Sequence, residues 1–327
     1  MSKMLVCPTC ATPFDAAARS ACDHGHDFSF FEGIPLCFTA QELATKVTAD
    51  PGYTMTRALE VAADMERRTT TFREAVDRFF EIREEELGTE LSREKGLITQ
   101  RTVGSVNESV AGASELLARM GKPFPAKGRH HIDVGCGLGF GLAASSRSYF
   151  GEKVIGLDLS PHYLVLAERL LAEHGVNDVL LCCADICDRW PIPLEHYDVA
   201  FISMEGVLEH IKDLPSFFAN VQRIQSFPTV MYMTVPYRWT IRPESHFNLR
   251  FISWLPRPLQ DRYIAWRLGV PEIDHVEFYS VRSMRRLLSR YLKPDAFIVA
   301  KNSNNPMWAH YLRAMIYIEG PQSFRAG

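Results

Sequence analysis

The chain lacks both a long apolar run and a strong excess of charge of either sign. No uninterrupted apolar stretch approaches the roughly 18 residues that a membrane helix needs, and residues 1–10 lack the long apolar segment of a secretory signal. The net charge is only −3, from 36 basic and 39 acidic residues, which gives the whole molecule no electrostatic basis for nonspecific nucleic-acid binding. These absences predict a cytoplasmic protein with no membrane span and make nucleic acid a less favoured partner.

The composition is otherwise that of an ordinary globular protein. Of the 327 residues, 46% are hydrophobic and 23% are charged, and the length is sufficient for two domains. Half of the eight cysteines, at positions 136, 182, 183 and 187, lie in or beside predicted core strands. A free thiol there behaves as a small hydrophobic side chain, so we expect no disulfide framework.

An apolar strand runs into a glycine-rich turn at residues 130–139, with the sequence HHIDVGCGLG. Alternating glycines let the chain turn sharply after a strand, and they remove the Cβ atoms that would hold a ligand's ribose and charged tail at a distance. The helix that follows presents free N–H groups to a carboxylate. The turn therefore predicts a site for an adenosyl cofactor.

Three further strands end in residues that suit the same ligand. Asp158 ends the strand 154–158, where an acid can accept two ribose hydroxyls, and Ser160-Pro161 then opens a helix. The strand 179–183 leads into Asp185 and Ile186, an acid and an apolar side chain suited to adenine. The strand 197–202 leads into the sequence SMEGVLEH. Strands alternating with helices predict a parallel sheet with the ligand at its carboxyl edge.

The chain resembles the class I S-adenosylmethionine-dependent methyltransferases over about two thirds of its length. The residues that carry the resemblance are Asp133, the three glycines of the turn, Asp158, Asp185-Ile186 and the VLEH sequence at 207–210. The resemblance implies a Rossmann-like α/β fold, with a seven-stranded sheet that ends in an antiparallel hairpin. The segments 229–235, 297–300 and 315–319 would complete that sheet. It also implies S-adenosylmethionine as cofactor, with S-adenosylhomocysteine as product. The expected cofactor-binding residues are Asp133, Gly135, Cys136, Gly137, Gly139, Asp158, Leu159, Asp185, Ile186 and Ser203.

A nicotinamide-binding Rossmann domain is the close competitor, but the glycine spacing disfavours it. Counted from Gly135, the dinucleotide fingerprint needs a small residue where Phe140 stands. Counted from Gly139, the pattern fits through Ala144 but places two glycines inside the preceding strand.

The amino-terminal segment carries two compact pairs of metal-ligating residues. Cys7 and Cys10 form the first pair, and Cys22 and His26 form the second. In a segment too small to have its own core, four such ligands predict a structural zinc site. His24 and Cys37 are alternatives for the fourth ligand, and we expect the strand 30–36 to close the ribbon.

We expect three parts along the chain: a zinc-ribbon-like domain at 1–38, a helical linker region covering the cofactor site at 39–122, and a methyltransferase domain at 123–327 with a cap insertion at 236–275. Helical spacing predicts one long helix over 54–87 and another over 105–120.

The cap segment 236–272 holds three tryptophans and six arginines against three acids. As a set, these residues suggest an acidic or aromatic small-molecule acceptor. An alternative interpretation is that the tryptophans pack a small helical subdomain with the arginines around it. A further alternative is that the part 251–268 contacts a membrane surface or a partner helix.

Three functions remain open. The favoured one is methyl transfer to a small biosynthetic acceptor at oxygen or nitrogen, with His210, His246 and Glu205 as candidate catalytic residues. A ribbon ahead of a class I domain also resembles the ribosomal RNA guanine-N1 methyltransferases, although residues 1–38 hold only Lys3 and Arg19 as fixed positive charges. The third is a non-enzymatic adenosyl-ligand-binding or partner-docking module.

Overall fold

The structure of the chain is a computed structural model. The residues it describes are 4–7, 10, 12–15, 22–25, 29–48, 53–88, 90–100, 103–123, 128–148, 154–176, 179–188, 190–194, 197–224, 228–244, 247–268, 276–292, 297–301 and 311–319. No helix among these residues is long and apolar enough to cross a membrane.

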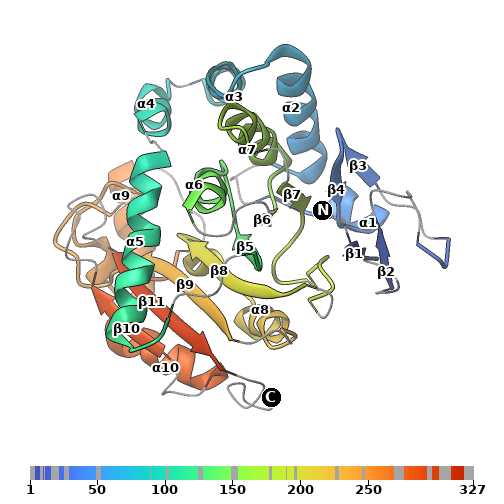
Figure 1. Cartoon of the computed structure of the whole chain (residues 1–327). Helices are drawn as coiled ribbons and strands as arrows, with labels where there is room; N and C mark the ends of the chain where they lie inside the picture. Colours follow the sequence, from blue (N-terminus) through green and yellow to red (C-terminus); the bar gives the residue numbers. More distant parts are fainter. Residues whose placement is uncertain are drawn as a thin grey trace.

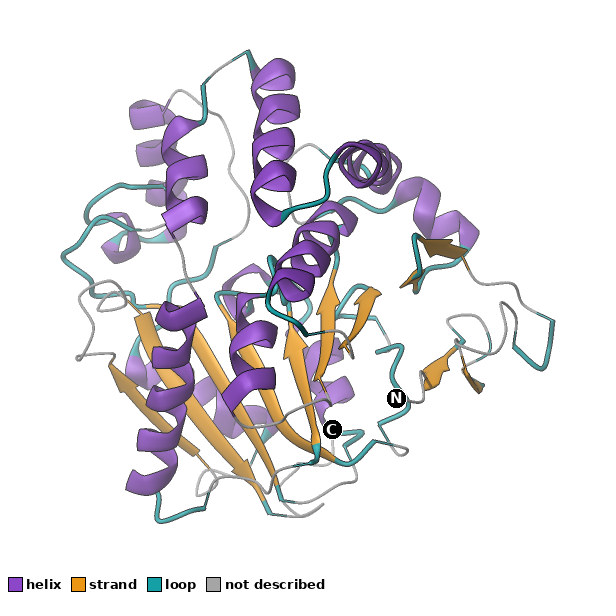
Figure 2. Cartoon of the chain, turned by 45° about the horizontal axis from the view of Figure 1, so that its top comes forward, coloured by secondary structure: helices purple, strands orange, loops and turns teal. Residues whose placement is uncertain are grey.

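A single sheet forms the centre of the molecule, with helices on both of its faces (Figures 1 and 2). The strands lie in the order β10-β11-β9-β8-β5-β6-β7-β4-β3. Neighbours from β4 to β9 are parallel, and the pairs at the two ends are antiparallel. The strands are β3 (Ser29–Phe31), β4 (Ile34–Leu36), β5 (His130–Val134), β6 (Val154–Asp158), β7 (Val179–Cys183), β8 (Val199–Glu205), β9 (Thr229–Pro236), β10 (Phe297–Lys301) and β11 (Tyr311–Ile318).

The predicted mixed α/β fold with a largely parallel sheet is confirmed. Strands β5 to β8 occur where the sequence predicts them, because each is an apolar run followed by turn residues. Strand β11 lies between β9 and β10, which gives the expected antiparallel hairpin at the end of the sheet.

The expectation that residues 30–36 close a small ribbon was wrong. These residues form β3 and β4, and β4 lies parallel to β7 at the edge of the main sheet. The Cys37 N–H donates to the carbonyl of Cys183 at 2.9 Å. All three residues of β4 are buried, so the hairpin covers the otherwise open, apolar edge of β7. The expected boundary at residue 38 therefore does not separate two sheets.

Helices cover the two faces of the sheet with different side-chain clusters. On one face, α5, α6 and α7 pack side by side over the strands. On the other face, α8 and α10 share a large apolar core with alternate residues of the same strands. The helices of these two layers are α5 (Val103–Arg119), α6 (Phe140–Ser148), α7 (Pro161–Glu173), α8 (Leu214–Val221) and α10 (Val281–Tyr291), and the segment between β9 and α10 adds α9 (Arg257–Leu268).

The single long helix expected over 54–87 is two helices, α2 (Met55–Arg68) and α3 (Phe72–Leu87). Three consecutive threonines separate them. Thr69 ends α2, and Thr71 begins α3 with a capping box in which its side chain and that of Glu74 bond each other's backbone N–H. Both helices pack on α7, and the apolar residues that recur at helical spacing are buried there apart from a half-buried Phe72. The buried residues of this apolar stripe are Ala58, Val61, Met65, Val76, Phe79, Phe80 and Ile82. Two more helices precede α5, namely α1 (Ala40–Thr45) and α4 (Ser92–Gln100).

The first two strands, β1 (Met4–Val6) and β2 (Pro13–Asp15), form a separate antiparallel pair. Strand β1 is attached to the segment before β8. The Val6 N–H donates to the Pro191 carbonyl at 2.6 Å, and the Tyr197 hydroxyl donates to the Met4 carbonyl at 2.9 Å. Leu5 is buried in the core under the sheet, so this small pair is anchored to the main domain.

A histidine is fully buried in the middle of the sheet. His131 of β5 packs beside the Phe201 ring, and its Nε2 lies 2.7 Å from the Ser203 hydroxyl. That hydroxyl donates to Asp133 Oδ1 at 2.5 Å. Burial lowers the pKa of His131 to about 3, because the interior disfavours the charged imidazolium. The folded protein therefore keeps this histidine neutral well below pH 6.

This burial predicts a pH dependence of stability. The unfolded chain takes a proton on His131 near pH 6.5, whereas the folded chain does so only near pH 3, so the free energy of unfolding falls as the pH is lowered. Between pH 7 and pH 5, we expect the charging of His131 in the unfolded chain to lower the free energy of unfolding by about 2 kcal/mol. In His131→Gln this part of the decrease should be absent, as measured by urea unfolding at both pH values. His174→Gln, at the end of α7, serves as the control. An unchanged pH slope in His131→Gln would contradict this prediction.

Candidate active site

Two adjoining cavities lie at the carboxyl edge of the parallel strands. The larger has a volume of about 530 Å³ and the smaller about 250 Å³. They share Gly135 and Gly137 of the glycine turn, Tyr163 of α7 and Glu205 at the end of β8. A ligand that spans both cavities would therefore cross the ends of β5, β6 and β8.

The three glycines of the turn have different surroundings. All three have positive φ, which glycine adopts without strain. A Cβ on Gly137 would meet nothing within 4 Å, whereas one on Gly135 would lie 2.4 Å from Val207 Cγ2. A Cβ on Gly139 would lie 2.9 Å from that of Ala167, and Gly139 lines neither cavity. Gly139 thus permits the close approach of α7, while Gly137 leaves open space for a ligand.

Asp158 connects the glycine turn to the start of α7. Its Oδ2 accepts the Gly137 N–H and its Oδ1 accepts the Ser160 N–H, both at 2.8 Å. Ser160 is the N-cap of α7, as the sequence predicts, but its side chain makes no capping bond. Asp158 lines the larger cavity and is only 8% exposed. Each carboxylate oxygen can accept more than one hydrogen bond, so the carboxylate can also accept hydroxyls from the cavity.

Asp185 carries an ion pair that the sequence did not predict. Lys46, which ends α1, places its Nζ 2.7 Å from Asp185 Oδ2 and 2.8 Å from Asp188 Oδ2. Burial lowers the pKa of Lys46, but its bonds and charge interactions with the two aspartates outweigh this effect and raise the pKa overall. The next residues, Val47 and Thr48, line the larger cavity, as Ile186 does. The amino-terminal region thus supplies one wall of the site.

The smaller cavity lies beside Asp133. Asp133 and Cys136 line it, together with Ile98 from α4. Burial, with the nearby charges of Asp158 and Asp133, raises the pKa of the Cys136 thiol, so it stays neutral. Ser203 lines neither cavity. It lies below them, bonded to Asp133, and therefore holds that acid in place.

The larger cavity also carries polar side chains suited to an acceptor. Glu205, His210 and Lys212 line it, and His210 and Lys212 are exposed at its rim. The backbone behind them is fixed, because the Glu209 carbonyl accepts the Glu277 N–H at 2.9 Å. His246, the other candidate catalytic histidine, lies outside the described residues.

Several lining residues were not predicted from the sequence, among them Val47, Thr48, Ile98, Tyr163 and Lys212. The first three come from the region expected to cover the site, but no motif distinguishes them. Lys212 follows the VLEH sequence by two residues, and this proximity is the one local signal that could have identified it.

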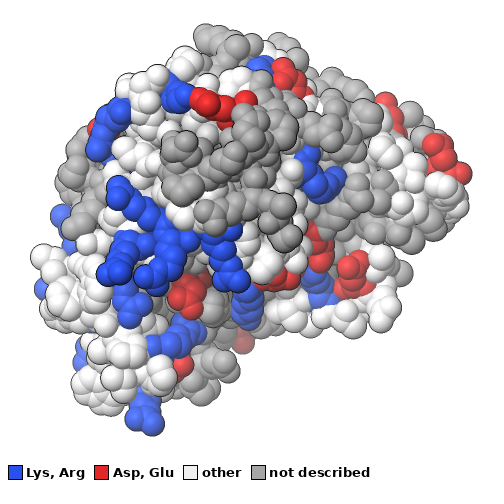
Figure 3. Space-filling model, turned by 90° about the horizontal axis from the view of Figure 1, so that it is seen from below, with Lys and Arg blue, Asp and Glu red and all other residues white. Residues whose placement is uncertain are grey.

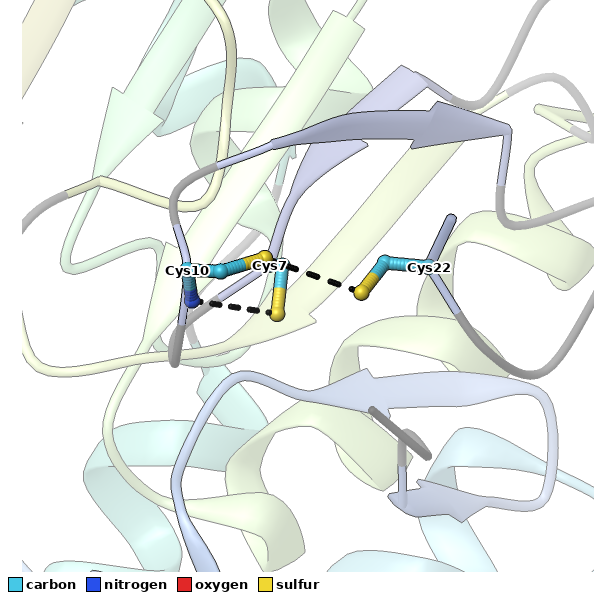
Figure 4. Close-up of side chains that lie close together, drawn as sticks. All are labelled: Cys7, Cys10 and Cys22. Atoms are coloured by element: carbon cyan, nitrogen blue, oxygen red, sulfur yellow. Dashed lines mark hydrogen bonds between the residues drawn. The ribbon is translucent and has the colours of Figure 1, made fainter. Parts of the chain in front are cut away.

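The amino-terminal cysteines converge as expected. Figure 4 shows the side chains of Cys7, Cys10 and Cys22 directed toward one another. The Cys10 and Cys22 sulfurs lie 3.6 Å apart, close to the roughly 3.8 Å between ligands of a tetrahedral zinc–thiolate site. The Cys10 N–H donates to the Cys7 sulfur at 3.5 Å. The three residues therefore fit a metal ion.

One of the two histidines considered for the fourth position lies beside the cysteine cluster. His24 Nδ1 is 3.5 Å from the Cys10 sulfur, whereas His26 lies outside the described residues. Cys37 instead interacts with Cys182 at the edge of the main sheet, which removes it as a candidate.

Comparisons with known proteins agree with this site. Residues 132–226 match the family model described as a methyltransferase domain. The chain is 34% identical to trans-aconitate 2-methyltransferase of Delftia acidovorans over 118 residues, covering 35% of this chain and 41% of that protein. It is 28% identical to the chloroplastic 2-methyl-6-phytyl-1,4-hydroquinone methyltransferase 1 of Oryza sativa subsp. japonica over 147 residues, covering 43% and 42%.

The matched regions thus span about two fifths of either relative. A solved S-adenosylmethionine-dependent methyltransferase from Aquifex aeolicus superposes with a TM-score of 0.43 at 17% identity, over 63% of this chain and 89% of that one. The matched segment 132–226 begins in β5 and contains the glycine turn, Asp158, Asp185 and the VLEH sequence. The chain thus contains a class I S-adenosylmethionine-dependent methyltransferase domain in this segment.

Proposed function

We propose that this protein transfers the methyl group of S-adenosylmethionine to a small acceptor, at an oxygen or nitrogen atom. The observation that carries the proposal is the pair of adjoining cavities at the strand ends. The cavities combine a buried acid, Asp158, and an open glycine turn with the polar side chains of Glu205, His210 and Lys212. When bound, the sulfonium supplies an activated methyl group, so the protein's task is to align the reactants and exclude water.

We assign the cofactor-binding roles as follows. The Asp158 carboxylate accepts the ribose hydroxyls, and Ile186 with Asp185 contacts the adenine. Asp133 lies beside the smaller cavity, where a positively charged amine can be held. The ion pair with Lys46 leaves lone pairs on Asp185 for an exocyclic amine, because a carboxylate accepts about four hydrogen bonds.

The acceptor end favours an acidic small molecule. Lys212 and His210 at the rim supply donors for a carboxylate, and Glu205 lies deeper, shared between both cavities. For an oxygen acceptor with a high pKa, a neutral His210 within reach can take the proton. The name of one relative fits this class, since trans-aconitate carries carboxylates, whereas the other relative is named for a neutral aromatic hydroquinone.

Ribosomal RNA is the weaker alternative acceptor. Figure 3 shows Lys and Arg side chains gathered on one part of the face seen from below. Helix α10 contributes four exposed arginines, Arg282, Arg285, Arg286 and Arg290, but it packs on β10 at one edge of the sheet. The cysteine cluster lies toward the opposite edge, near β7. A ribbon that guides RNA into the site would instead need basic residues between the ribbon and the cavities.

The ribose assignment predicts weaker cofactor binding in Asp158→Ala. We expect a loss of about 1.5 to 3 kcal/mol in the affinity for S-adenosylmethionine, the scale of hydrogen bonds to a charged group, measured by calorimetry. Asp198→Asn, at an exposed aspartate that pairs with Arg129, is the control. An unchanged affinity in a folded Asp158→Ala protein would reject the assignment.

Methyl transfer itself is tested with a tritiated donor, screened in parallel against a fractionated metabolite extract and total RNA. We expect label in the acidic or aromatic small-molecule fraction. With an oxygen acceptor, we expect His210→Gln to lower kcat about 100-fold, and Lys212→Met to raise KM for an acidic acceptor. Label in RNA alone would overturn the proposal, and label in neither fraction would favour a non-enzymatic adenosyl-binding module.

We also propose that Cys7, Cys10 and Cys22 hold a structural zinc ion, with His26 or His24 as the fourth ligand. A closed site of four protein ligands has no open position for a substrate, so the ion would stabilise the first two strands.

The zinc proposal predicts about one zinc per purified chain by elemental analysis. We expect Cys10→Ser to abolish zinc binding and Cys187→Ser, outside the cluster, to leave it unchanged. Comparing His24→Ala with His26→Ala identifies the fourth ligand. A wild-type protein that takes up no zinc after reduction and zinc addition would refute the site.

A further inference from the structure

The segment after β9 exposes an unusual amount of apolar surface. Ten large apolar side chains are exposed among the described residues, and seven of them lie between residues 239 and 268. They are Trp239, Ile241, Phe251, Trp254, Leu259, Trp266 and Leu268, which we call the aromatic patch. Trp266 is 74% exposed and Ile241 is 68% exposed. Such a concentration on a globular protein marks an interaction surface rather than ordinary scatter.

Part of the patch is held in a fixed arrangement. The ring of Trp254 lies edge-on to those of Trp239 and Phe251, at centroid distances of 5.8 and 5.6 Å. The Trp254 indole N–H donates to the Thr240 carbonyl at 2.7 Å. Phe251 has a φ of 63°, a costly conformation for a residue with a bulky side chain. The backbone therefore presents these rings outward instead of burying them.

Helix α9 extends the patch. Leu259, Arg262 and Trp266 are spaced at i, i+3 and i+7, which places them on one face of the helix. All three are exposed, whereas Gln260 and Ile264 are buried on the other side.

The exposed charges around the patch are predominantly positive. Arg242, Arg250, Arg262 and Arg267 are exposed, and the Arg238 and Arg267 guanidinium groups lie over the rings of Trp239 and Trp266. The two acids among the described residues of this segment are otherwise engaged. Glu244 is buried at 2% exposure, and Asp261 pairs with Arg257 at 3.5 Å.

We propose that the aromatic patch docks on the surface of an anionic lipid bilayer. Tryptophan is the side chain that favours the membrane–water interface, and arginines beside it attract acidic headgroups. Single-stranded RNA also binds aromatic rings and arginines, but the exposed aliphatic side chains Ile241, Leu259 and Leu268 offer no stacking face. Lipid acyl chains bury them as readily as they bury the rings.

The segment that carries the patch is bonded to the backbone next to the larger cavity. The Tyr279 N–H donates to the Pro236 carbonyl at 3.0 Å, which joins the two ends of the segment to each other. The Glu277 N–H donates to the carbonyl of Glu209, and the next residue, His210, lines the larger cavity. The base of the segment is thus connected to one residue of the cavity wall.

The test is partition of the full-length protein onto phosphatidylcholine vesicles with and without phosphatidylglycerol, measured by cosedimentation. We expect binding only when the anionic lipid is present, and loss of binding at high salt. We expect Trp239→Ala/Trp266→Ala to weaken partition about tenfold or more, and Arg250→Gln/Arg262→Gln to weaken it about fivefold for each charge removed.

Matched controls lie on α2 and α3, outside the patch. Leu87→Ala removes an apolar side chain of similar exposure, and Arg68→Gln/Arg73→Gln removes two exposed charges. We expect both controls to bind vesicles as the wild type does. Absence of vesicle binding would overturn the proposal, as would equal losses in the controls. Binding of an RNA oligonucleotide that depends on the patch, without vesicle binding, would assign the surface to RNA. Cofactor affinity, measured separately, is expected to be unaffected in every variant.

Discussion

The arrangement of the site depends on one carboxylate at the end of β6. Asp158 accepts backbone N–H groups from the glycine turn and from the start of α7 with its two oxygens. It thereby fixes the positions of two loops that come from different strand–helix units, and it keeps Gly137 open toward the cavity. Because these bonds are made to the backbone, the carboxylate is already oriented before any ligand arrives. Such preorganisation lowers the entropic cost of binding.

The amino-terminal third of the chain completes the site rather than standing apart from it. Strand β4 extends the main sheet, α4 contributes Ile98 to the smaller cavity, and Lys46 bridges Asp185 and Asp188. The side chains of Lys46 and Asp185 are only 21% and 20% exposed. Solvent and salt therefore screen this ion pair less than an exposed one. The ion pair joins the region before residue 54 to the strand end where we place the adenine. We therefore expect substitutions in that region to alter the affinity for the cofactor.

The parts of the fold that sequence reasoning predicted are those determined locally. Strands β5 to β8, the glycine turn and Asp158 each follow from apolar runs and turn residues within a few positions of one another. The parts it missed depend on contacts between distant segments. The pairing of β4 with β7 and the ion pair of Lys46 with Asp185 join residues more than one hundred positions apart, and no local pattern specifies them. The break at Thr69–Thr71 had a local signal, since threonines before Glu74 suit a helix start, but the continuing apolar stripe concealed it.

We place an adenosyl ligand across the ends of β5, β6, β7 and β8, with its ribose on Asp158. A crystal structure with S-adenosylhomocysteine is the decisive experiment. We expect ribose hydroxyls within hydrogen-bonding distance of the Asp158 oxygens, the adenine beside Ile186, and the sulfur directed toward Glu205. A ligand bound elsewhere, or a cavity closed by Val47 and Thr48 with no ligand in it at saturating concentration, would contradict this placement.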